Sequence, residues 1–368
     1  MPTHGADAAQ PGTDQIITPE HRRYDAADIS WFIRSAYVAL GVPEADAATV
    51  AGLMVQADLL GYDTHGSFRL RQYINRLRDG GTNTVAKLSL ASEASASAVV
   101  DGDNGLGHLA MLRATDLAIE KARDNGVGWV GVRNGNHAGP ASLYVNRVAE
   151  QDMIGIVAAV GSANHVAPFG GMDLLLGTNP LAIAVPAGEA PVFVLDMATT
   201  TAAAGKIKVL AQRGETMPEG WMVDREGNPL TDPNRQSEGL MLPIGGAKGY
   251  GLAMAIGLIA GTLNGAAFGK DVVSFSKDTT SATNTGQFVA AISIKAFGDV
   301  DAFKATVDGI FATMRGSTPL PGRGAVRIPG QERQALLLER RANGIPLHPN
   351  LVKALSQIAH ELKIPELA

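Results

Sequence analysis

The stretch VGWVGVRNGNHAGPASLYVNRVAEQDMIGIVAAV, residues 127–160, decides the fold class of this chain. It opens with the short apolar run VGWVGV and closes with MIGIVAAV, and such runs between polar or glycine-rich segments are typical of buried strands. Between them, PASLYVNRVAEQD has the apolar spacing of an amphipathic helix. Two strands separated by a helix predict a mixed α/β domain.

The same alternation continues on both sides of this stretch. SASAVVDG predicts a strand and LAMLRATDLAIEKARDNG a helix before it, and LAIAVP, PVFVLDMAT and QFVAAISI predict strands after it. Residues 24–80 are helical in pattern, with Asp63 or Thr64 as a possible N-cap of the last helix. Helical patterns return after 245 and dominate from 299 onward, apart from a joint rich in proline and glycine at 318–332.

These patterns predict three parts of the chain. Residues 1–22 form a disordered tail, because they contain no apolar core. Residues 23–90 and 290–368 form one helical domain from the two ends of the chain, and residues 91–289 form the α/β domain.

Composition excludes several classes of protein. The 368 residues are 45% hydrophobic and 18% charged, with a net charge of −5, which is unlike a nucleic-acid-binding chain. There are no cysteines, so disulfides and thiol catalysis are excluded. The longest apolar run, LAMAIGLIAGTL, is well short of the roughly 20 residues of a membrane-spanning helix. Since no signal peptide is visible either, we expect a cytoplasmic location.

The segment GYDTHGSFRL, residues 61–70, places an imidazole and a guanidinium four residues apart. If this segment is a helix, His65, Arg69 and Tyr73 share one face. Arginine binds carboxylates with two parallel hydrogen bonds, and a neighbouring histidine can transfer a proton. The pattern therefore indicates a site for a carboxylate substrate, although a capped surface helix would show the same residues.

Two further loops carry histidine after a strand. GVRNGNHAGPASLY presents Asn136 and His137, and GSANHVAPFGG presents Ser162, Asn164 and His165. Such loops can converge on one cleft, and each can equally be an ordinary turn. The spacing of His65, His137 and His165 does not favour a metal site, so we predict no metal.

The usual nucleotide-binding motifs are absent. GDNGLG does not have the Gly-x-Gly-x-x-Gly spacing of a Rossmann fold, and GGAKGYG lacks the spacing of a P-loop. Lys248 nevertheless lies among glycines directly before an apolar helix, where it could hold a phosphate or ribose oxygen. A surface turn is the alternative.

Eight blocks occur in one order along the chain: DTHGSFRL, GNHAG, VAPFGG, LLGTNPLAIAVP, LDMATTTAAAGKI, GWMVDREGNPLTDP, GGAKGYGLAM and RIPGQE. Together they resemble the malate/L-lactate dehydrogenase family of the second, non-Rossmann type. That family also contains ureidoglycolate dehydrogenase, diketogulonate reductase, sulfolactate dehydrogenase and piperideine-2-carboxylate reductase. The resemblance covers about residues 25–350. It implies an α/β (α+β) fold in which a non-Rossmann mixed-sheet domain binds the nicotinamide cofactor and the substrate.

The resemblance also implies roles for particular residues. His65 is similar to the proton donor of some members, His137 to the proton acceptor of others, and Arg69 to the clamp on the substrate carboxylate. The implied substrate-binding residues are Arg69, Tyr73, Thr178 and Asn179. The implied cofactor-binding residues are Ser162, Asp196, Met197, Ala198, Lys248, Gly249, Asn284, Thr285, Gly286, Gly330, Gln331 and Glu332. The chain departs from the family at Thr64, where serine is frequent, and at Pro140, so the substrate itself stays open.

We therefore predict an oxidoreductase that transfers a hydride between a nicotinamide cofactor and a small acid. The acid is a 2-oxo or 2-hydroxy acid like malate, lactate or ureidoglycolate, or a cyclic imino acid. The cofactor is NAD or NADP, with NAD preferred, and the resemblance implies a homodimer. Either His65 or His137 is the acid/base, and we favour His137. The alternatives are a metal-dependent lyase that uses the histidines and a non-catalytic oligomeric binding protein.

Overall fold

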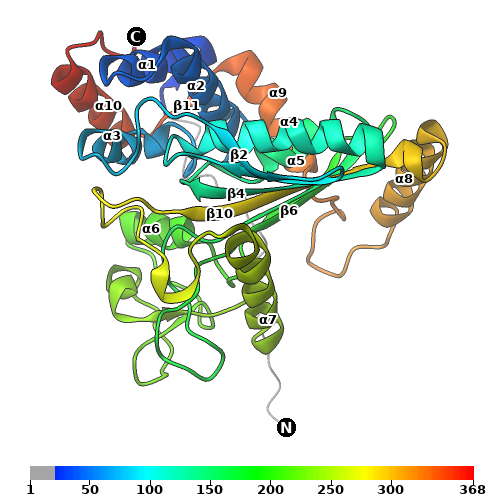
Figure 1. Cartoon of the computed structure of the whole chain (residues 1–368). Helices are drawn as coiled ribbons and strands as arrows, with labels where there is room; N and C mark the ends of the chain where they lie inside the picture. Colours follow the sequence, from blue (N-terminus) through cyan, green and yellow to red (C-terminus); the bar gives the residue numbers. More distant parts are fainter. Residues whose placement is uncertain (1–20) are drawn as a thin grey trace.

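A seven-stranded mixed sheet forms the centre of the computed structural model, which describes residues 21–368 (Figure 1). Its strand order is β2-β3-β4-β10-β5-β6-β7, and only β3 and β4 are parallel neighbours. The mixed α/β class is thereby confirmed. The strands are β2 (Ser89–Glu93), β3 (Ser97–Asp101), β4 (Val127–Gly135), β5 (Met153–Ala159), β6 (Leu181–Val185), β7 (Phe193–Met197) and β10 (Thr285–Ser293).

Strand β10 inserts between β4 and β5, although it lies far from both in the sequence. Its residues are buried from Thr285 to Ala291, which explains the nearly continuous apolar run QFVAAISI. The domain boundary predicted at 289/290 therefore falls inside this strand. The division into domains itself stays a prediction.

One face of the sheet is covered by α4 (Gly107–Asn125) and α5 (Ser142–Ala149). Further helices from both ends of the chain gather above them (Figure 1). The two ends are joined by a short antiparallel pair of β1 and β11 that the sequence did not predict. These elements are β1 (Arg23–Tyr24), α1 (Ala26–Ala39), α2 (Glu44–Leu59), α3 (Leu70–Arg78), α9 (Gln331–Asn343), β11 (Ile345–Pro346) and α10 (Pro349–Leu362).

Helix α8 (Val300–Arg315) is placed differently from the prediction, which assigned it to the helical domain. It lies away from the other terminal helices (Figure 1). Its buried Val307 and Phe311 pack with Ala187, just beyond β6, because these apolar side chains find their partners there. The predicted tail 1–22 lies almost entirely outside the described residues.

A smaller lobe lies against the other face of the sheet (Figure 1). It has its own cluster of buried apolar side chains, which includes Ile207, Met217 and Met241. Among residues 21–368, no helix is both long enough and apolar enough to cross a membrane. The elements of this side are α6 (Ala204–Arg213), β8 (Met222–Val223), β9 (Leu240–Met241), α7 (Ala247–Ile256), a π-helical turn (Gly257–Gly261) and the 3₁₀ turns Pro233–Glu238, Thr262–Asn264 and Gly269–Asp271. A further 3₁₀ turn, Ile294–Ala296, follows β10.

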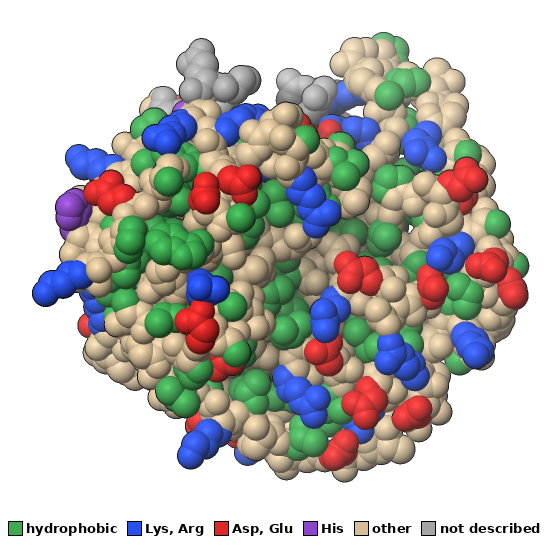
Figure 2. Space-filling model, turned by 90° about the horizontal axis from the view of Figure 1, so that it is seen from above, with side chains coloured by type: hydrophobic (Ala, Val, Ile, Leu, Met, Phe, Trp, Pro, Cys, Tyr) green, Lys and Arg blue, Asp and Glu red, His purple; other side chains and the backbone are tan. Residues whose placement is uncertain are grey.

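The helical side of the molecule carries charges of both signs. Figure 2 shows Lys and Arg side chains interspersed with Asp and Glu over the face seen from above, with apolar side chains between them. This face therefore has no single sign of charge that would attract a polyanion.

Arg340 of α9 connects the C-terminal helices to the turn that follows α2. Its side chain is fully buried, and both terminal nitrogens donate to the carboxylate of Asp63. It also donates to the main-chain oxygen of Asp58. The planar guanidinium matches a carboxylate in two places, so this contact sets the orientation as well as the distance of the two segments.

We expect Arg340→Met to lower the free energy of unfolding by about 3–5 kcal/mol, because it leaves the Asp63 carboxylate buried without its cation. Urea unfolding measures the change. Arg341→Met is the matched control: its side chain is exposed, so we expect a change within about 0.5 kcal/mol. A loss equally small in Arg340→Met would show that the contact does not hold the helices together.

Candidate active site

The turn between α2 and α3 differs from the sequence prediction. A helix is present in the predicted segment, but its predicted start at Asp63 or Thr64 is wrong: a 3₁₀ turn covers Ser67–Arg69, and α3 begins only at Leu70. His65 precedes both, and its N–H donates to the oxygen of Tyr62. His65 and Arg69 therefore do not share a helical face.

Hydrogen bonds within the turn bring the two side chains close instead. Arg69 donates from Nε to the main-chain oxygen of Thr64 at 2.8 Å and from Nη1 to Gln72 Oε1 at 2.8 Å. The Thr64 hydroxyl lies 2.9 Å from His65 Nδ1. Both partners of Arg69 are neutral, and it forms no ion pair within residues 21–368. Burial lowers the pKa of Arg69, as expected of a cation that lacks a counter-charge.

The side chain of Asp58 holds this turn through a hydrogen bond to its main chain. Asp58 Oδ2 accepts the N–H of Ser67 at 2.9 Å. A Cβ atom at Gly66 would lie 2.0 Å from Asp58 Oδ1, so only glycine allows this close contact. Burial raises the pKa of Asp58 to about 7. The turn that carries His65 and Arg69 thus rests on a carboxyl group that titrates near neutrality.

The loop after β4 brings His137 to the same place. The Tyr73 hydroxyl and His137 Nδ1 are 2.6 Å apart. The rings of His65 and His137 stack with centroids 5.7 Å apart and an angle of 21° between their planes. Phe275 contacts the rings of both Tyr73 and His137. The structure therefore places the predicted residues His65, Arg69, Tyr73 and His137 together.

Both imidazoles of this pair are neutral near pH 7. Burial, followed by the charge of Arg69, lowers the pKa of His65 to about 3 and that of His137 well below its ordinary value. The main-chain N–H of Gly139 donates to His137 Nδ1 at 3.3 Å. An N–H can only donate, so Nδ1 is the acceptor and the ring proton lies on Nε2. Neutral His137 thus has a defined tautomer.

His108 is a fifth member of the cluster, which the sequence analysis did not predict. It is fully buried, its ring meets the edge of Tyr73 at 5.4 Å, and neither ring nitrogen has a hydrogen-bond partner in the described chain. The preceding Gly107 explains its position: a Cβ there would lie 2.1 Å from the oxygen of Asn136. The glycines of GDNGLG therefore allow α4 to pack against the loop of His137. In the sequence, the run GLGH (residues 105–108) was the signal that could have indicated this position of His108.

The predicted cofactor residues Lys248 and Gly249 lie in the first turn of α7. Gly245 and Gly246 precede it with φ of +59° and +63°, which glycine adopts readily. Lys248 is exposed, and the helix has no side-chain cap. The two glycines also line a cavity of about 420 Å³. Free N–H groups at a helix start together with a lysine fit the phosphates of a dinucleotide.

Asp196 and the segment 330–332 lie next to each other around β7. Asp196 Oδ2 accepts the N–H of Ser142 at 2.9 Å, so it caps the start of α5, and burial raises the pKa of Asp196. The N–H of Val194 donates to the oxygen of Pro329, and a Cβ at Gly330 would lie 2.8 Å from Val194 N. The cofactor contacts of Asp196, Met197, Ala198, Gly330, Gln331 and Glu332 stay predictions.

Thr178 and Asn179 hold main-chain segments together. Asn179 is fully buried; its Oδ1 accepts the N–H of Gly161 and its Nδ2 donates to the oxygen of Ala253, both at 2.8 Å. The oxygen of Thr178 accepts from Thr199. Their contact with substrate stays a prediction, and the structure shows that Asn179 joins the segment after β5 to α7.

Ser162 is close to the cluster through Phe275, whereas Asn284 contacts the end of β4. The oxygen of Ser162 accepts the N–H of Phe275, whose ring contacts His137. Asn284 Oδ1 accepts the N–H of Asn134 at 2.7 Å. Thr285 and Gly286 are buried at the start of β10. The predicted cofactor contacts of these residues stay predictions.

His165 lies in the third predicted loop, but no ring contact links it to His65 or His137 within the described chain. Burial lowers the pKa of His165, and so do the nearby charges of Lys208 and Lys277. In residues 21–368 there is no group of three or more His, Asp or Glu side chains arranged to hold a metal ion. His165 therefore belongs to the surroundings of Lys208.

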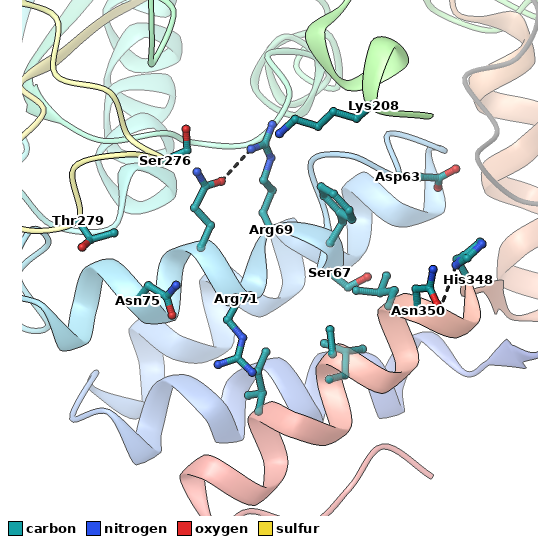
Figure 3. A pocket seen from close by; sticks show the side chains of 16 residues that line it. Asp63, Ser67, Arg69, Arg71, Asn75, Lys208, Ser276, Thr279, His348 and Asn350 are labelled. Carbon is teal, nitrogen blue, oxygen red and sulfur yellow. Dashed lines mark hydrogen bonds between the residues drawn. The ribbon is translucent and has the colours of Figure 1, made fainter. Parts of the chain in front are cut away.

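A cavity of about 500 Å³ opens beside Arg69, between the turn, α3 and α10 (Figure 3). Arg69, Gln72 and Lys208 line one part of it, and the apolar Leu351, Leu355 and Ile358 line another. The buried cluster thus has a neighbouring space large enough for a small molecule.

Residues 24–356 match the family model described as malate/L-lactate dehydrogenase. The chain belongs to this family. A family member named L-sulfolactate dehydrogenase from Methanothermobacter thermautotrophicus is 40% identical over 332 residues, 90% of this chain and 95% of the relative. Ureidoglycolate dehydrogenase (NAD(+)) from Escherichia coli O157:H7 is 34% identical over 330 residues, 88% of this chain and 94% of the relative.

A solved structure of the malate/L-lactate dehydrogenase family supports the same assignment. Sulfolactate dehydrogenase from Methanocaldococcus jannaschii superposes with a TM-score of 0.87 and 38% identity, over 93% of this chain and 98% of the other. The resemblance seen in the sequence is confirmed, and the protein is an oxidoreductase of this family. The comparisons give no support to the lyase alternative.

We expect Asp58→Asn to change how stability depends on pH. Between about pH 4 and about pH 7, Asp58 of the parent is protonated in the folded state but ionised in the unfolded state. The free energy of unfolding of the parent therefore falls as pH rises through this window. Asparagine can still accept from Ser67 and does not titrate. The variant should therefore gain stability relative to the parent between about pH 5 and about pH 8.

Urea unfolding of parent and variant at the two pH values measures this difference, and the contributions of the buried histidines cancel in it. Asp58→Ala, which removes the acceptor as well, should lower stability at both pH values. A difference between Asp58→Asn and the parent that is the same at both values would show that Asp58 is ionised throughout.

Proposed function

We propose that the protein transfers a hydride between a nicotinamide cofactor and C2 of a small 2-oxo or 2-hydroxy acid. The observation that carries this proposal is the cation of Arg69: it is largely buried, its protein partners are neutral, and it lies beside two neutral imidazoles. A carboxylate would supply the missing counter-charge, and the neighbouring histidines can serve the oxygen on C2.

In this proposal Arg69 binds the substrate carboxylate with the N–H groups that Thr64 and Gln72 leave free. The bound anion raises the pKa of His65 and His137, because their charged forms are now attracted to it. Protonated His137 can then give its Nε2 proton to the oxygen on C2 during reduction. Unlike in the ligand-free protein, the remaining ring proton then lies on Nδ1, where the Tyr73 hydroxyl oxygen can accept its hydrogen bond, and Nε2 can take the proton back during oxidation. We propose His137 for this role because Tyr73 and Gly139 both hold its ring.

The nicotinamide supplies the hydride and takes it back in the reverse reaction. Lys248 and the start of α7 are the groups that we propose for its phosphates. A lysine and main-chain N–H groups can bind the phosphates of NAD and NADP alike, and we propose NAD as the preferred cofactor. We also propose that the protein acts in the cytoplasm as a homodimer, on the basis of its family.

The proposal is tested with purified protein, reduced NAD or reduced NADP, and a panel of acids: oxaloacetate, pyruvate and piperideine-2-carboxylate. Loss of the absorbance of the reduced nicotinamide measures turnover. We expect turnover of at least one acid and no loss of activity with a chelator. No oxidation of either cofactor with any acid of the panel would overturn the proposal.

We expect His137→Asn to lower turnover about 10²- to 10⁴-fold, the usual contribution of a general acid or base, and His65→Asn to have the smaller effect. Both keep a polar side chain of similar size, so the melting temperatures show whether folding is intact. His360→Asn, on the exposed end of α10, is the control. If His65→Asn has the larger effect, His65 is the acid/base. Near-normal turnover in both variants would show that neither histidine is the acid/base.

Arg69→Lys keeps the positive charge but loses the two-pronged geometry. We expect kcat/KM for the best acid to fall about 10- to 150-fold, which corresponds to about 1.5–3 kcal/mol for a hydrogen bond between charged groups. The fall should be much smaller for an analogue whose carboxylate is an amide. Arg78→Lys, at the end of the helix α3 that follows Arg69, is the matched control, because its partner is the exposed Glu361. Unchanged kinetics in Arg69→Lys would exclude the clamp.

A further inference from the structure

Lys208 of α6 reaches the cavity that opens beside Arg69. Figure 3 shows the two side chains extending toward one another from opposite walls. Burial of part of the side chain, followed by the charge of Arg69, lowers the pKa of Lys208, which agrees with two cations at short range. Within residues 21–368, Lys208 forms neither a hydrogen bond nor an ion pair.

The packing of α6 explains how Lys208 comes to this position. At the start of the helix, a Cβ on Gly205 would lie 2.9 Å from Thr64 Cγ2, so the absence of a side chain allows α6 to press against the turn. Lys208 follows Gly205 by three residues and so lies on the same side of the helix. The contact with Thr64 thereby carries Lys208 to Arg69.

The charges around the cavity do not cancel. Among the described residues that line it, the only carboxylate is that of Asp63, which is already paired with the buried Arg340. A third lining cation, Arg71, is paired with Glu361 at 2.6 Å. Arg69 and Lys208 are left as two cations with no acidic partner in the described chain. Two like charges held together in this way are stabilised by a ligand that is itself negative.

We propose that Lys208 binds a second anionic group of the substrate, so that the enzyme prefers 2-oxo acids with a carboxylate or sulfonate at the far end. Arg69 holds the carboxylate on C1, and Lys208 holds the second anion across the cavity. The inference rests on the proposed function and adds the residue that selects among its substrates.

A substrate with one charge can satisfy only Arg69. Its uncharged end would leave Lys208 without a counter-charge, and an uncharged group loses the charge-assisted bond. Because Lys208 is exposed, solvent weakens this bond, and we expect a moderate preference rather than an absolute one. Lys208 is therefore a determinant of specificity that is not required for turnover itself.

The test compares two substrates that differ only at the far end: oxaloacetate and its 4-amide, 2-oxosuccinamate. For the full-length parent we expect kcat/KM to be about 5- to 50-fold higher for oxaloacetate. Lys208→Met should abolish this preference by lowering kcat/KM for oxaloacetate alone, and Lys208→Arg should retain most of it. Added salt should reduce the parent's preference, because a partly exposed ion contact is screened.

Lys206→Met is the matched control. It removes the same charge from the same helix, but Lys206 lies over the ring of Trp221 and does not line the cavity. We expect it to keep the parent's preference. Melting temperatures of both variants show that each is folded.

Each outcome decides the proposal. It is overturned if the parent turns over both acids equally, if it prefers the amide, or if Lys208→Met keeps the preference for oxaloacetate; in these cases hydride transfer still stands. Turnover of neither acid, nor of pyruvate or piperideine-2-carboxylate, with either nicotinamide would overturn the proposed function, and this inference with it. A preference that is lost in Lys208→Met and kept in Lys206→Met supports it.

Discussion

The bidentate contact between Arg340 and Asp63 is the interaction on which the candidate site depends. It fixes a turn from the N-terminal part of the chain to a helix from the C-terminal part. Asp58 holds the same turn through the N–H of Ser67. Two buried carboxyl groups thus shape one short segment, and that segment carries His65 and Arg69. The cost of burying these acids is offset only if their partners stay in place, which makes the turn rigid.

A rigid turn explains why the cation of Arg69 and two neutral imidazoles can remain close together. In water, Arg69 would move away from the histidines or recruit a carboxylate. Here its Nε and Nη1 are held by Thr64 and Gln72, which do not neutralise it. The result is a site prepared for an anion before the anion arrives, so less ordering is needed when substrate binds.

The sequence predicted six of the seven strands of the central sheet, the class of fold and the meeting of His65, Arg69, Tyr73 and His137, because local apolar patterns and eight family blocks carry that information. It missed β2, whose residues are all exposed and show no apolar alternation. It predicted the turn wrongly, because helix signals such as Asp63 and Thr64 do not reveal that Asp63 pairs with an arginine far along the chain. His108 and Lys208 were missed for a similar reason. Their positions depend on the small size of Gly107 and Gly205, which only matters once two segments are packed together.

These glycines show how packing and charge are linked in this molecule. Gly205 lets α6 approach Thr64, and this approach brings Lys208 to Arg69. The approach of two cations raises the energy of the ligand-free site, and an anionic ligand that bridges them recovers that energy. Affinity for such a ligand therefore arises from the contact between two helical segments as much as from the groups that touch it. A larger residue at 205 would move Lys208 away from Arg69 and weaken the recognition of a second anion, although both charges would still be present.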